Sequence, residues 1–278
     1  MKSPLPLCCA PHAFALMVRQ SQAIHSPDAL LEGALAIAMH QMPDVNLGHV
    51  DRVLQSYADT VRSRVRGSQQ QAMLAHLHEF LFDELDFCGN TDDYYNPENS
   101  YLPAVLKSHR GLPIALSLIY KIVAERVGLR CWGVGLPGHF VTGVEGDGRT
   151  ILIDAFDRGR SITHDEAHER MRQTLGDEIE WSEELLEPVS NLHWLTRILQ
   201  NLLHIFGANR QYNDVAAMLE MEMILWPKQI HLQRDLALVL ARIGMSQPAS
   251  VWLNQYLQGN PDDPQKGDLV QLLEVLSA

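Results

Sequence analysis

Three neighbouring stretches decide the fold: GLPIALSLIYKIVAERVGLRCWGV (residues 111–134), GLPGHFVTGV (135–144) and ILIDAF (151–156). Apolar residues follow Pro113 at helical spacing as far as Val127. Pro113 suits the first turn of a helix, where its missing N–H costs little, and Gly128 suits the position just beyond the last turn. We predict an apolar helix over this range, with a sharp turn of the chain at Gly128.

The pattern after Gly128 changes from helix to strand. Short runs rich in Val, Ile, Phe and Thr, separated by Gly and Asp, occupy residues 130–136, 139–145 and 149–155. The Gly-Asp-Gly link at 146–148 suits a hairpin turn, because glycine accepts the positive φ that such turns need. We therefore predict consecutive antiparallel strands and an α+β fold.

The chain before these stretches is predicted to be helical with one loop. Residues 26–87 fit three helices, the third from about Ser68 to Leu85. A loop follows at 88–100 (CGNTDDYYNPENS), where Gly, Asn, Asp and Pro favour turns, and we expect its two tyrosines to be buried. A short helix is predicted at 101–107.

The chain after the strands returns to helix. Thr163 and Glu166 form a capping box, which pairs two backbone N–H groups at a helix start. From Trp194 onward the pattern is helical throughout, and several positions recur 34 residues apart. These pairs are Pro227 and Pro261, Leu202 and Leu236, Phe206 and Leu240, Val215 and Ala249, and Leu219 and Leu253. This is the tetratricopeptide period, so we predict a helical-repeat tail, packed on the main domain because two copies are too few to be stable alone.

The charge balance and the cysteines exclude several classes of function. The formal charge is -12, which repels phosphate backbones and anionic membrane surfaces, so we expect no direct binding to nucleic acid or membrane. The four cysteines, Cys8, Cys9, Cys88 and Cys131, lack the spacing of a disulfide framework or a C-x-x-C site, which favours a reducing compartment. The start of the chain is interpreted as an untidy N-terminus without a signal peptide, and no stretch is apolar enough for a membrane span. A cytoplasmic location is expected.

One glycine motif is interpreted as structural. Gly133, Gly135 and Gly138 fit the dinucleotide pattern G-x-G-x-x-G. That pattern binds a pyrophosphate only when a helix N-terminus follows, and here a strand is predicted to follow. We predict a tight turn between strands and no nucleotide site.

A histidine pair is also interpreted as structural. His164 and His168 lie one helical turn apart in HDEAH, which is similar in spacing to the zinc motif H-E-x-x-H. The position of the general base holds Asp165, and Glu166 is better used in the capping box. We expect no metal and no cofactor.

The residue pair best suited to a catalytic role is His139 and Asp154. His139 opens one predicted strand and Asp154 closes the next, so the hairpin should bring them almost opposite each other. A carboxylate beside an imidazole fixes the tautomer and stabilises the imidazolium, as in the base-and-orienter half of a nucleophilic triad. The alternative is a structural hydrogen bond at a strand end.

These stretches resemble the transglutaminase-like superfamily, whose catalytic helix is followed by strands that carry a His and an Asp. More closely, GNTDDYYNPENSYLPAVLKSHRGLPIALS (89–117) together with GLPGHF (135–140) resembles the bacterial SirB-type proteins, a transglutaminase-like domain followed by tetratricopeptide repeats. The resemblance runs from about Leu30 to the C-terminus. It implies a papain-like α+β domain with a small antiparallel sheet and an all-α tail. The expected division is an N-terminal segment (1–27), the transglutaminase-like domain with its N-terminal helices (28–190) and the repeats (191–278).

The sequence departs from the superfamily at the nucleophile. Counting back along the predicted helix, the position of the catalytic cysteine falls on Pro113. The superfamily places its cysteine at a helix N-terminus, where the partial positive charge lowers the pKa of the thiol. Proline has no nucleophilic atom, so we interpret the chain as a pseudoenzyme that retains His139 and Asp154.

The alternative is an enzyme with a relocated nucleophile. Cys88 lies in the loop before the site and could fold over it, whereas Cys131 begins a strand and suits a small buried position. A cysteine-type hydrolase or transferase would then use His139 and Asp154 with Cys88. A hydrolase in which His139 activates water is a second form of this alternative.

The first hypothesis is therefore a non-catalytic binding or adaptor protein. Its partner is expected to be a protein or peptide, held by the cleft or by the repeats, and a part in gene regulation through such a partner is a third hypothesis. Polar and aromatic residues are predicted to line the cleft and to bind by hydrogen bonding and stacking. They are Asn90, Asp92, Asp93, Tyr94, Tyr95, Asn99 and His139. The sequence leaves the oligomeric state open.

Overall fold

The computed structural model describes residues 5–67, 69–146, 149–175 and 182–277. The chain divides into two compact units. One unit is the continuous stretch 44–198, and the other combines both ends of the chain, 1–43 and 199–278. Among the described residues, no helix combines the length and the apolar character needed to cross a membrane.

Helix α6 (Pro113–Arg126) is the central helix of the 44–198 unit. It is buried on almost every side, as expected for a helix without a polar face. It packs against α3 (Leu47–Arg64), α5 (Leu102–Ser108) and the first strands of the sheet. The predicted helix is confirmed, and Gly128 follows it with a φ of +90°.

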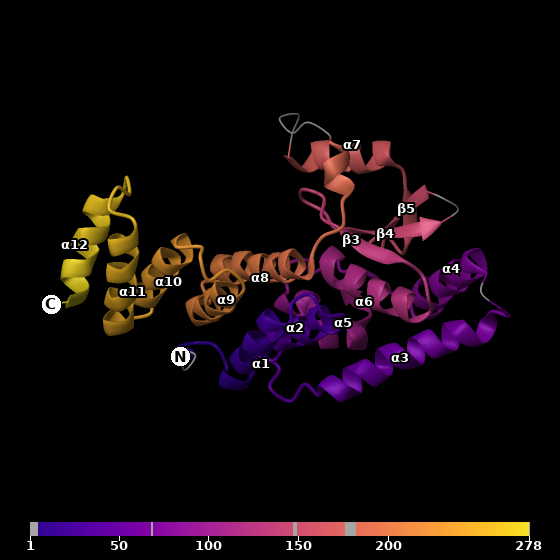
Figure 1. Ribbon diagram of the computed structural model, residues 1–278, viewed down its shortest axis with the longest axis horizontal. Helices are drawn as coiled ribbons and strands as arrows, with labels where there is room; N and C mark the ends of the chain where they lie inside the picture. Colours follow the sequence, from indigo (N-terminus) through magenta and orange to yellow (C-terminus); the bar gives the residue numbers. More distant parts are fainter. Residues whose placement is uncertain (1–4, 68, 147–148, 176–181, 278) are drawn as a thin grey trace. The chain divides into compact units, whose positions relative to one another are not determined.

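A four-stranded antiparallel sheet lies between α6 and α7 (His164–Leu175) in Figure 1. Its strands, in spatial order, are β3 (Cys131–Val134), β4 (Val141–Gly146), β5 (Arg149–Asp154) and β6 (Arg160–Ile162). Val141, Leu152 and Ile162 on one face pack with Ala167 of α7.

The sheet differs from the sequence prediction in two places. The second strand begins at Val141, so His139 lies in the connection before it and not within the strand. The fourth strand, β6, was not predicted, because three residues are too short for a clear alternation. The predicted hairpin turn includes residues 147–148, which lie outside the described residues.

The segment before α6 is more broken than predicted. The single helix expected at 68–85 is α4 (Gln70–His78) followed by a π-helical turn, Glu79–Glu84. The loop then pairs β1 (Cys88–Gly89) in parallel with β2 (Arg110–Gly111), and a 3₁₀ turn covers Pro97–Ser100. Tyr94 and Tyr95 are 39% and 60% exposed, so the predicted burial of these tyrosines is wrong. The loop buries the polar Asn99 in their place.

The second unit is all helical. It contains α1 (Pro11–Gln22), α2 (Ala29–Ala38), the later part of α8 (Asn191–Ala208), α9 (Tyr212–Leu225), α10 (His231–Arg242), α11 (Ser246–Gly259) and α12 (Lys266–Ser277). Helices α10, α11 and α12 pack in succession, as Figure 1 shows. The starts and ends of α9 and α11 are 34 residues apart, as are the positive-φ residues Arg210 and Gly244 before them. The 34-residue offset between apolar positions in the sequence is therefore also the offset between the boundaries of α9 and α11.

The N-terminal helices belong to the same unit as the C-terminal helices, unlike the predicted division at residues 27 and 190. Two Oε atoms of Glu220 accept hydrogen bonds from the backbone N–H groups of residues 7, 8 and 9 at 2.6–3.1 Å. His40 Nε2 lies 3.0 Å from Asp214 Oδ1. Buried Phe14, Leu16 and Met17 of α1 add apolar contact. Within the described part of the predicted N-terminal segment, residues 11–22 form helix α1, which Pro11 begins.

Candidate functional site

The structure brings His139 and Asp154 together. Nε2 of His139 lies 2.9 Å from Oδ2 of Asp154. The Asp154 side chain is fully buried, whereas that of His139 is 17% exposed. A carboxylate partner favours the tautomer with its hydrogen on Nε2, which leaves Nδ1 as the acceptor. Nδ1 makes no hydrogen bond to any residue that the structure describes. One ring nitrogen is therefore hydrogen-bonded to Asp154, and the other can accept a hydrogen bond.

The second oxygen of Asp154 organises the turn after β5. Oδ1 accepts hydrogen bonds from the backbone N–H groups of Phe156 (3.0 Å) and Asp157 (3.2 Å). The carbonyl of Asp154 accepts a further bond from the N–H of Gly159 at 2.9 Å. Gly159 has a φ of +71°, which favours glycine, and a side chain there would overlap the ring of Phe82. Asp154 therefore fixes the turn and orients the imidazole at the same time.

Arg170 of α7 is a third member of the site that sequence reasoning missed. Its Nη1 donates to Oδ2 of Asp154, and its Nη2 donates to Oδ2 of Asp157 at 3.2 Å. Nη1 also lies 3.5 Å from Nε2 of His139. In the sequence Arg170 is one of several charges on a polar helix, and only the packing of α7 on the sheet brings it to Asp154.

The surroundings of Asp154 keep its side chain ionised. Burial by itself would raise the pKa of this carboxyl. The hydrogen bond from His139, together with the charges of His139 and Arg170 and the backbone N–H of Asp157, outweighs burial and lowers the pKa below its usual value. A carboxylate of this kind serves as a fixed orienting group and not as a proton donor.

The backbone of His139 is held from a different helix. Nη2 of Arg197, on α8, donates to the carbonyl oxygens of Leu136 and His139, both at 3.0 Å. The guanidinium of Arg197 lies over the ring of Phe140, 5.2 Å from its centroid. Burial lowers the pKa of Arg197. The turn that presents His139 is therefore rigidly supported.

The glycines of the G-x-G-x-x-G pattern have packing roles in this turn. A side chain at Gly133 would overlap the ring of Trp194, and one at Gly135 would overlap the guanidinium of Arg197. Gly138 has a φ of +72°. Strand β4 follows the pattern, as predicted.

A row of four aromatic rings leads from the surface to His139. Ring centroids lie 5.3 Å apart for Tyr95 and Tyr94, 6.0 Å for Tyr94 and Phe156, and 6.5 Å for Phe156 and His139. Neighbouring rings are close to perpendicular, a favourable arrangement for aromatic pairs. We call these four residues the aromatic row. Phe156 was not predicted, although its place two residues after Asp154 could have suggested it.

The two predicted asparagines support the loop that carries the tyrosines. Nδ2 of Asn99 donates to the carbonyls of Asp93 and Tyr94, and its Oδ1 accepts from Nδ2 of Asn90 at 2.9 Å. The carbonyl of Asn99 also accepts from the N–H of Leu112, at the start of α6. These contacts use the hydrogen-bonding groups of Asn99 within the loop. Oδ1 of Asn90 in turn accepts from the N–H of Asp93, so this aspartate takes part in the turn.

Pro113 occupies the first position of α6 and is buried. One helical turn later lies Ser117, which is also buried, and its Oγ has no hydrogen-bond partner among the described residues. The position that the superfamily resemblance assigns to the nucleophile thus carries no thiol or hydroxyl. A helix N-terminus remains there without a group to activate.

The two candidate cysteines differ in their surroundings. Cys131 is buried in β3, and burial raises the pKa of its thiol far above the ordinary range, which makes it unreactive. Cys88 is half-buried in β1, next to Gly89, whose N–H donates to the carbonyl of Phe156 at 2.8 Å. No hydrogen bond joins Cys88 to His139 in the described part of the chain. Cys88 therefore lies near the turn of the site without contacting the imidazole.

The histidine pair of α7 lies at a capped helix start. The backbone N–H of Thr163 donates to Oε2 of Glu166, and the N–H of Glu166 donates to Oγ1 of Thr163, so the predicted capping box is confirmed. Within the described ranges, no three or more His, Cys, Asp or Glu side chains are grouped to hold a metal ion.

Comparison with known proteins places this geometry in a family. Residues 48–200 match the Transglutaminase-like superfamily. A UPF0162 protein of Xylella fastidiosa (strain 9a5c) is 34% identical over 251 residues, which cover 87% of this chain and 89% of that protein. A UPF0162 protein of Pseudomonas aeruginosa is 27% identical over 187 residues, 66% of each chain. Human F-box only protein 21 is 27% identical over 239 residues, 74% of this chain and 37% of its own length. No solved structure matches.

Proposed function

The chain belongs to the transglutaminase-like superfamily and to the UPF0162 family, and from this premise we propose that it is a non-catalytic binding or adaptor module. The observation that carries the proposal is Pro113 at the first position of α6, where the superfamily resemblance expects a cysteine. Without a nucleophile, the His139–Asp154 pair has no group to deprotonate at that helix start.

The aromatic row supports binding as the remaining use of the site. Tyr95 and Tyr94 are exposed although the loop beneath them is tightly hydrogen-bonded, so two large rings are held in solvent by a rigid support. Exposed, preorganised aromatic rings are typical of surfaces that bind other molecules, because they add contact area at a low entropy cost. We assign the row, with His139 at its inner end, to recognition of a protein or peptide.

The helical unit supports the adaptor part of the proposal. Its 34-residue offset, seen in both helix boundaries and apolar positions, favours a tetratricopeptide-like arrangement and a SirB-type organisation of the chain. Such repeats present extended surfaces to partners. In this view the chain carries two binding surfaces, one in each unit.

The test of the proposal is a pair of assays on the full chain. Wild-type protein should not incorporate dansylcadaverine into casein, because no thiol lies at the start of α6. The variant Pro113→Cys restores a thiol at the helix N-terminus, and amine incorporation by this variant, absent from Pro113→Ser, would show that the cysteine is the part of the catalytic set that the wild type lacks. Amine incorporation by the wild type that disappears in His139→Ala would refute the non-catalytic assignment.

One observation favours an enzyme as the second candidate. Cys88 is half-buried and flanks the turn that holds Asp154, so a small movement of the loop would change its distance to His139. A cysteine-type hydrolase or transferase would then use these three residues. This version requires that a thiol-directed probe label Cys88 in the native protein and that His139→Ala slow the labelling. Equal labelling rates in the two proteins rule it out.

A further inference from the structure

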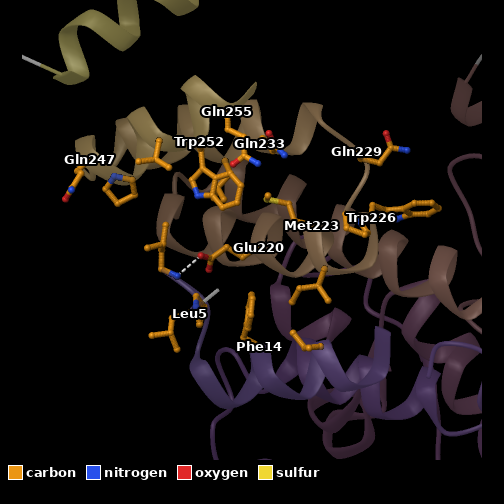
Figure 2. Close-up of a pocket in the computed structure, with 18 residues that line it drawn as sticks. Leu5, Phe14, Glu220, Met223, Trp226, Gln229, Gln233, Gln247, Trp252 and Gln255 are labelled. Atoms are coloured by element: carbon orange, nitrogen blue, oxygen red, sulfur yellow. Dashed lines mark hydrogen bonds between the residues drawn. The ribbon is translucent and has the colours of Figure 1, made fainter. Parts of the chain in front are cut away.

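An apolar groove lies in the helical unit, outside the site described above. It has a volume of about 820 Å³ and lies between the N-terminal segment with α1 and helices α9, α10 and α11. Figure 2 shows Leu5 and Phe14 on the N-terminal side and Met223, Gln233 and Trp252 on the side of the C-terminal helices. Val251, on α11, lines the groove and is 59% exposed, so the groove opens to solvent.

The groove carries almost no free charge. Glu220 is the single charged side chain among the described residues that line it. Its carboxylate already accepts the N–H groups of residues 7, 8 and 9, and Figure 2 shows the bond to residue 7. An anionic ligand would lose its hydration beside this carboxylate, and a cationic ligand would find the carboxylate oxygens already hydrogen-bonded to three N–H groups. The occupant that fits is uncharged.

The polar groups left in the groove are side-chain amides. They belong to Gln229, Gln233, Gln247 and Gln255. Oε1 of Gln233 is buried and accepts no hydrogen bond among the residues that the structure describes. A buried acceptor without a donor is unfavourable, so an N–H or O–H from an occupant would stabilise this oxygen. Amide side chains carry a donor and an acceptor each, which is also the pattern of a peptide bond.

Residues 5–7 (Leu-Pro-Leu) form one edge of the groove as irregular main chain, outside any helix or strand. They are seated by main-chain N–H donation to Glu220 and not by charge pairs. Leu5 and Leu7 remain 87% and 41% exposed, so this edge is itself an apolar contact surface.

We propose that the groove binds an extended, uncharged and apolar segment of a partner polypeptide. Its apolar side chains pack against Met223, Leu236 and Trp252, and one of its main-chain N–H groups donates to Oε1 of Gln233. This inference deepens the proposed function, on which it rests for the idea that the chain acts by binding. It names the surface in the helical unit and the chemistry of the partner.

The experiment uses the full-length protein and a phage-displayed library of random twelve-residue peptides. Enriched peptides are synthesised with blocked ends, and their affinity is measured by fluorescence polarisation. We expect uncharged, apolar sequences that weaken at least tenfold for Val251→Asp. For Gln233→Met, which keeps the length but removes the acceptor, we expect roughly tenfold weaker binding. Val275→Asp is the matched control, because Val275 is 73% exposed on α12 and does not line the groove.

Three results would overturn the proposal. They are enrichment of charged peptides, equal affinity for the wild type and Val251→Asp, and failure to enrich any peptide that depends on this residue. Binding of neutral phosphatidylcholine vesicles that Val251→Asp abolishes, without peptide binding, would assign the groove to lipid. Tyr95→Ala should leave the affinity unchanged, so the groove is tested separately from the aromatic row and from the turnover assay.

Discussion

Replacing Asp154 with Asn tests whether this carboxylate is the organising charge of the site. The amide is nearly the same size and its oxygen can still accept from the N–H groups of Phe156 and Asp157. What is lost is the negative charge that binds His139 and Arg170. Hydrogen bonds to charged groups contribute about 1.5–3 kcal/mol each, and the asparagine recovers part of this. We expect the free energy of unfolding of the 44–198 unit to fall by about 3 kcal/mol.

The pH dependence of the stability difference between wild type and Asp154→Asn provides a second test of this prediction. The pKa of Asp154 is lowered in the folded protein, whereas an unfolded Asp titrates near about 3.9. The carboxylate therefore contributes its full stability above about pH 5, and this contribution is lost as the pH falls through the folded pKa. The difference between wild type and Asp154→Asn should begin to shrink as the pH falls below about 4.

The assay must read one unit, because the chain has two and need not unfold in one step. Hydrogen exchange of the β4 and β5 amides, followed by mass spectrometry in increasing denaturant, gives the opening free energy of the sheet. Asp157→Asn is the matched control: Asp157 is 48% exposed and also binds Arg170, so its loss should cost less than about 1 kcal/mol. Equal costs for the two variants, or a difference that does not begin to shrink as the pH falls below about 4, would refute the organising role of Asp154.

Three further predictions concern the same unit. Arg170→Ala should raise the pKa of Asp154, because it removes a positive charge and a hydrogen bond, and carboxyl ¹³C NMR titration measures this directly. Gly89→Ala should lower the free energy of unfolding by about 1–3 kcal/mol, because a side chain there overlaps the ring of Phe156. Thermal denaturation monitored by circular dichroism measures this effect. An unchanged melting temperature would contradict the prediction. Burial lowers the pKa of His78 to about 4, so the unfolded chain binds its proton first and stability should fall as the pH drops from about 6.5 to about 4. His78→Gln should flatten this part of the stability profile, measured by denaturant titration at pH 7, 6 and 5.

Local patterns in the sequence predicted the parts of the fold that depend on local chemistry. The helix from Pro113, the capping box at Thr163 and the antiparallel strands follow from spacing, turn residues and hydrogen bonds between near neighbours. The approach of His139 to Asp154 follows from the same hairpin, although His139 lies before the strand and not in it.

The parts that were missed depend on contacts between distant segments. Arg170 reaches Asp154 only after α7 folds back over the sheet, and nothing in its own neighbourhood marks it. Asn99 is buried and its amide holds the carbonyls of Asp93 and Tyr94, whereas the rings of Tyr94 and Tyr95 are exposed. The residues just before α1 are hydrogen-bonded to Glu220 of α9, some 200 residues away, so a division made along the sequence separated segments that belong to one unit.

The composition of the helical unit from both ends of the chain constrains the order of its assembly. Helices α1 and α2 leave the ribosome first, but α9, which supplies Glu220, follows only after the whole 44–198 stretch has been made. At 5–20 residues per second this delay is roughly 10 to 40 s, during which α1 and α2 can pack on each other but not on α9. The continuous unit, by contrast, is synthesised as one stretch, so its folding does not have to wait for the C-terminal helices. During synthesis the helical unit therefore stays incomplete for longer than the unit that lies between its two parts in the sequence.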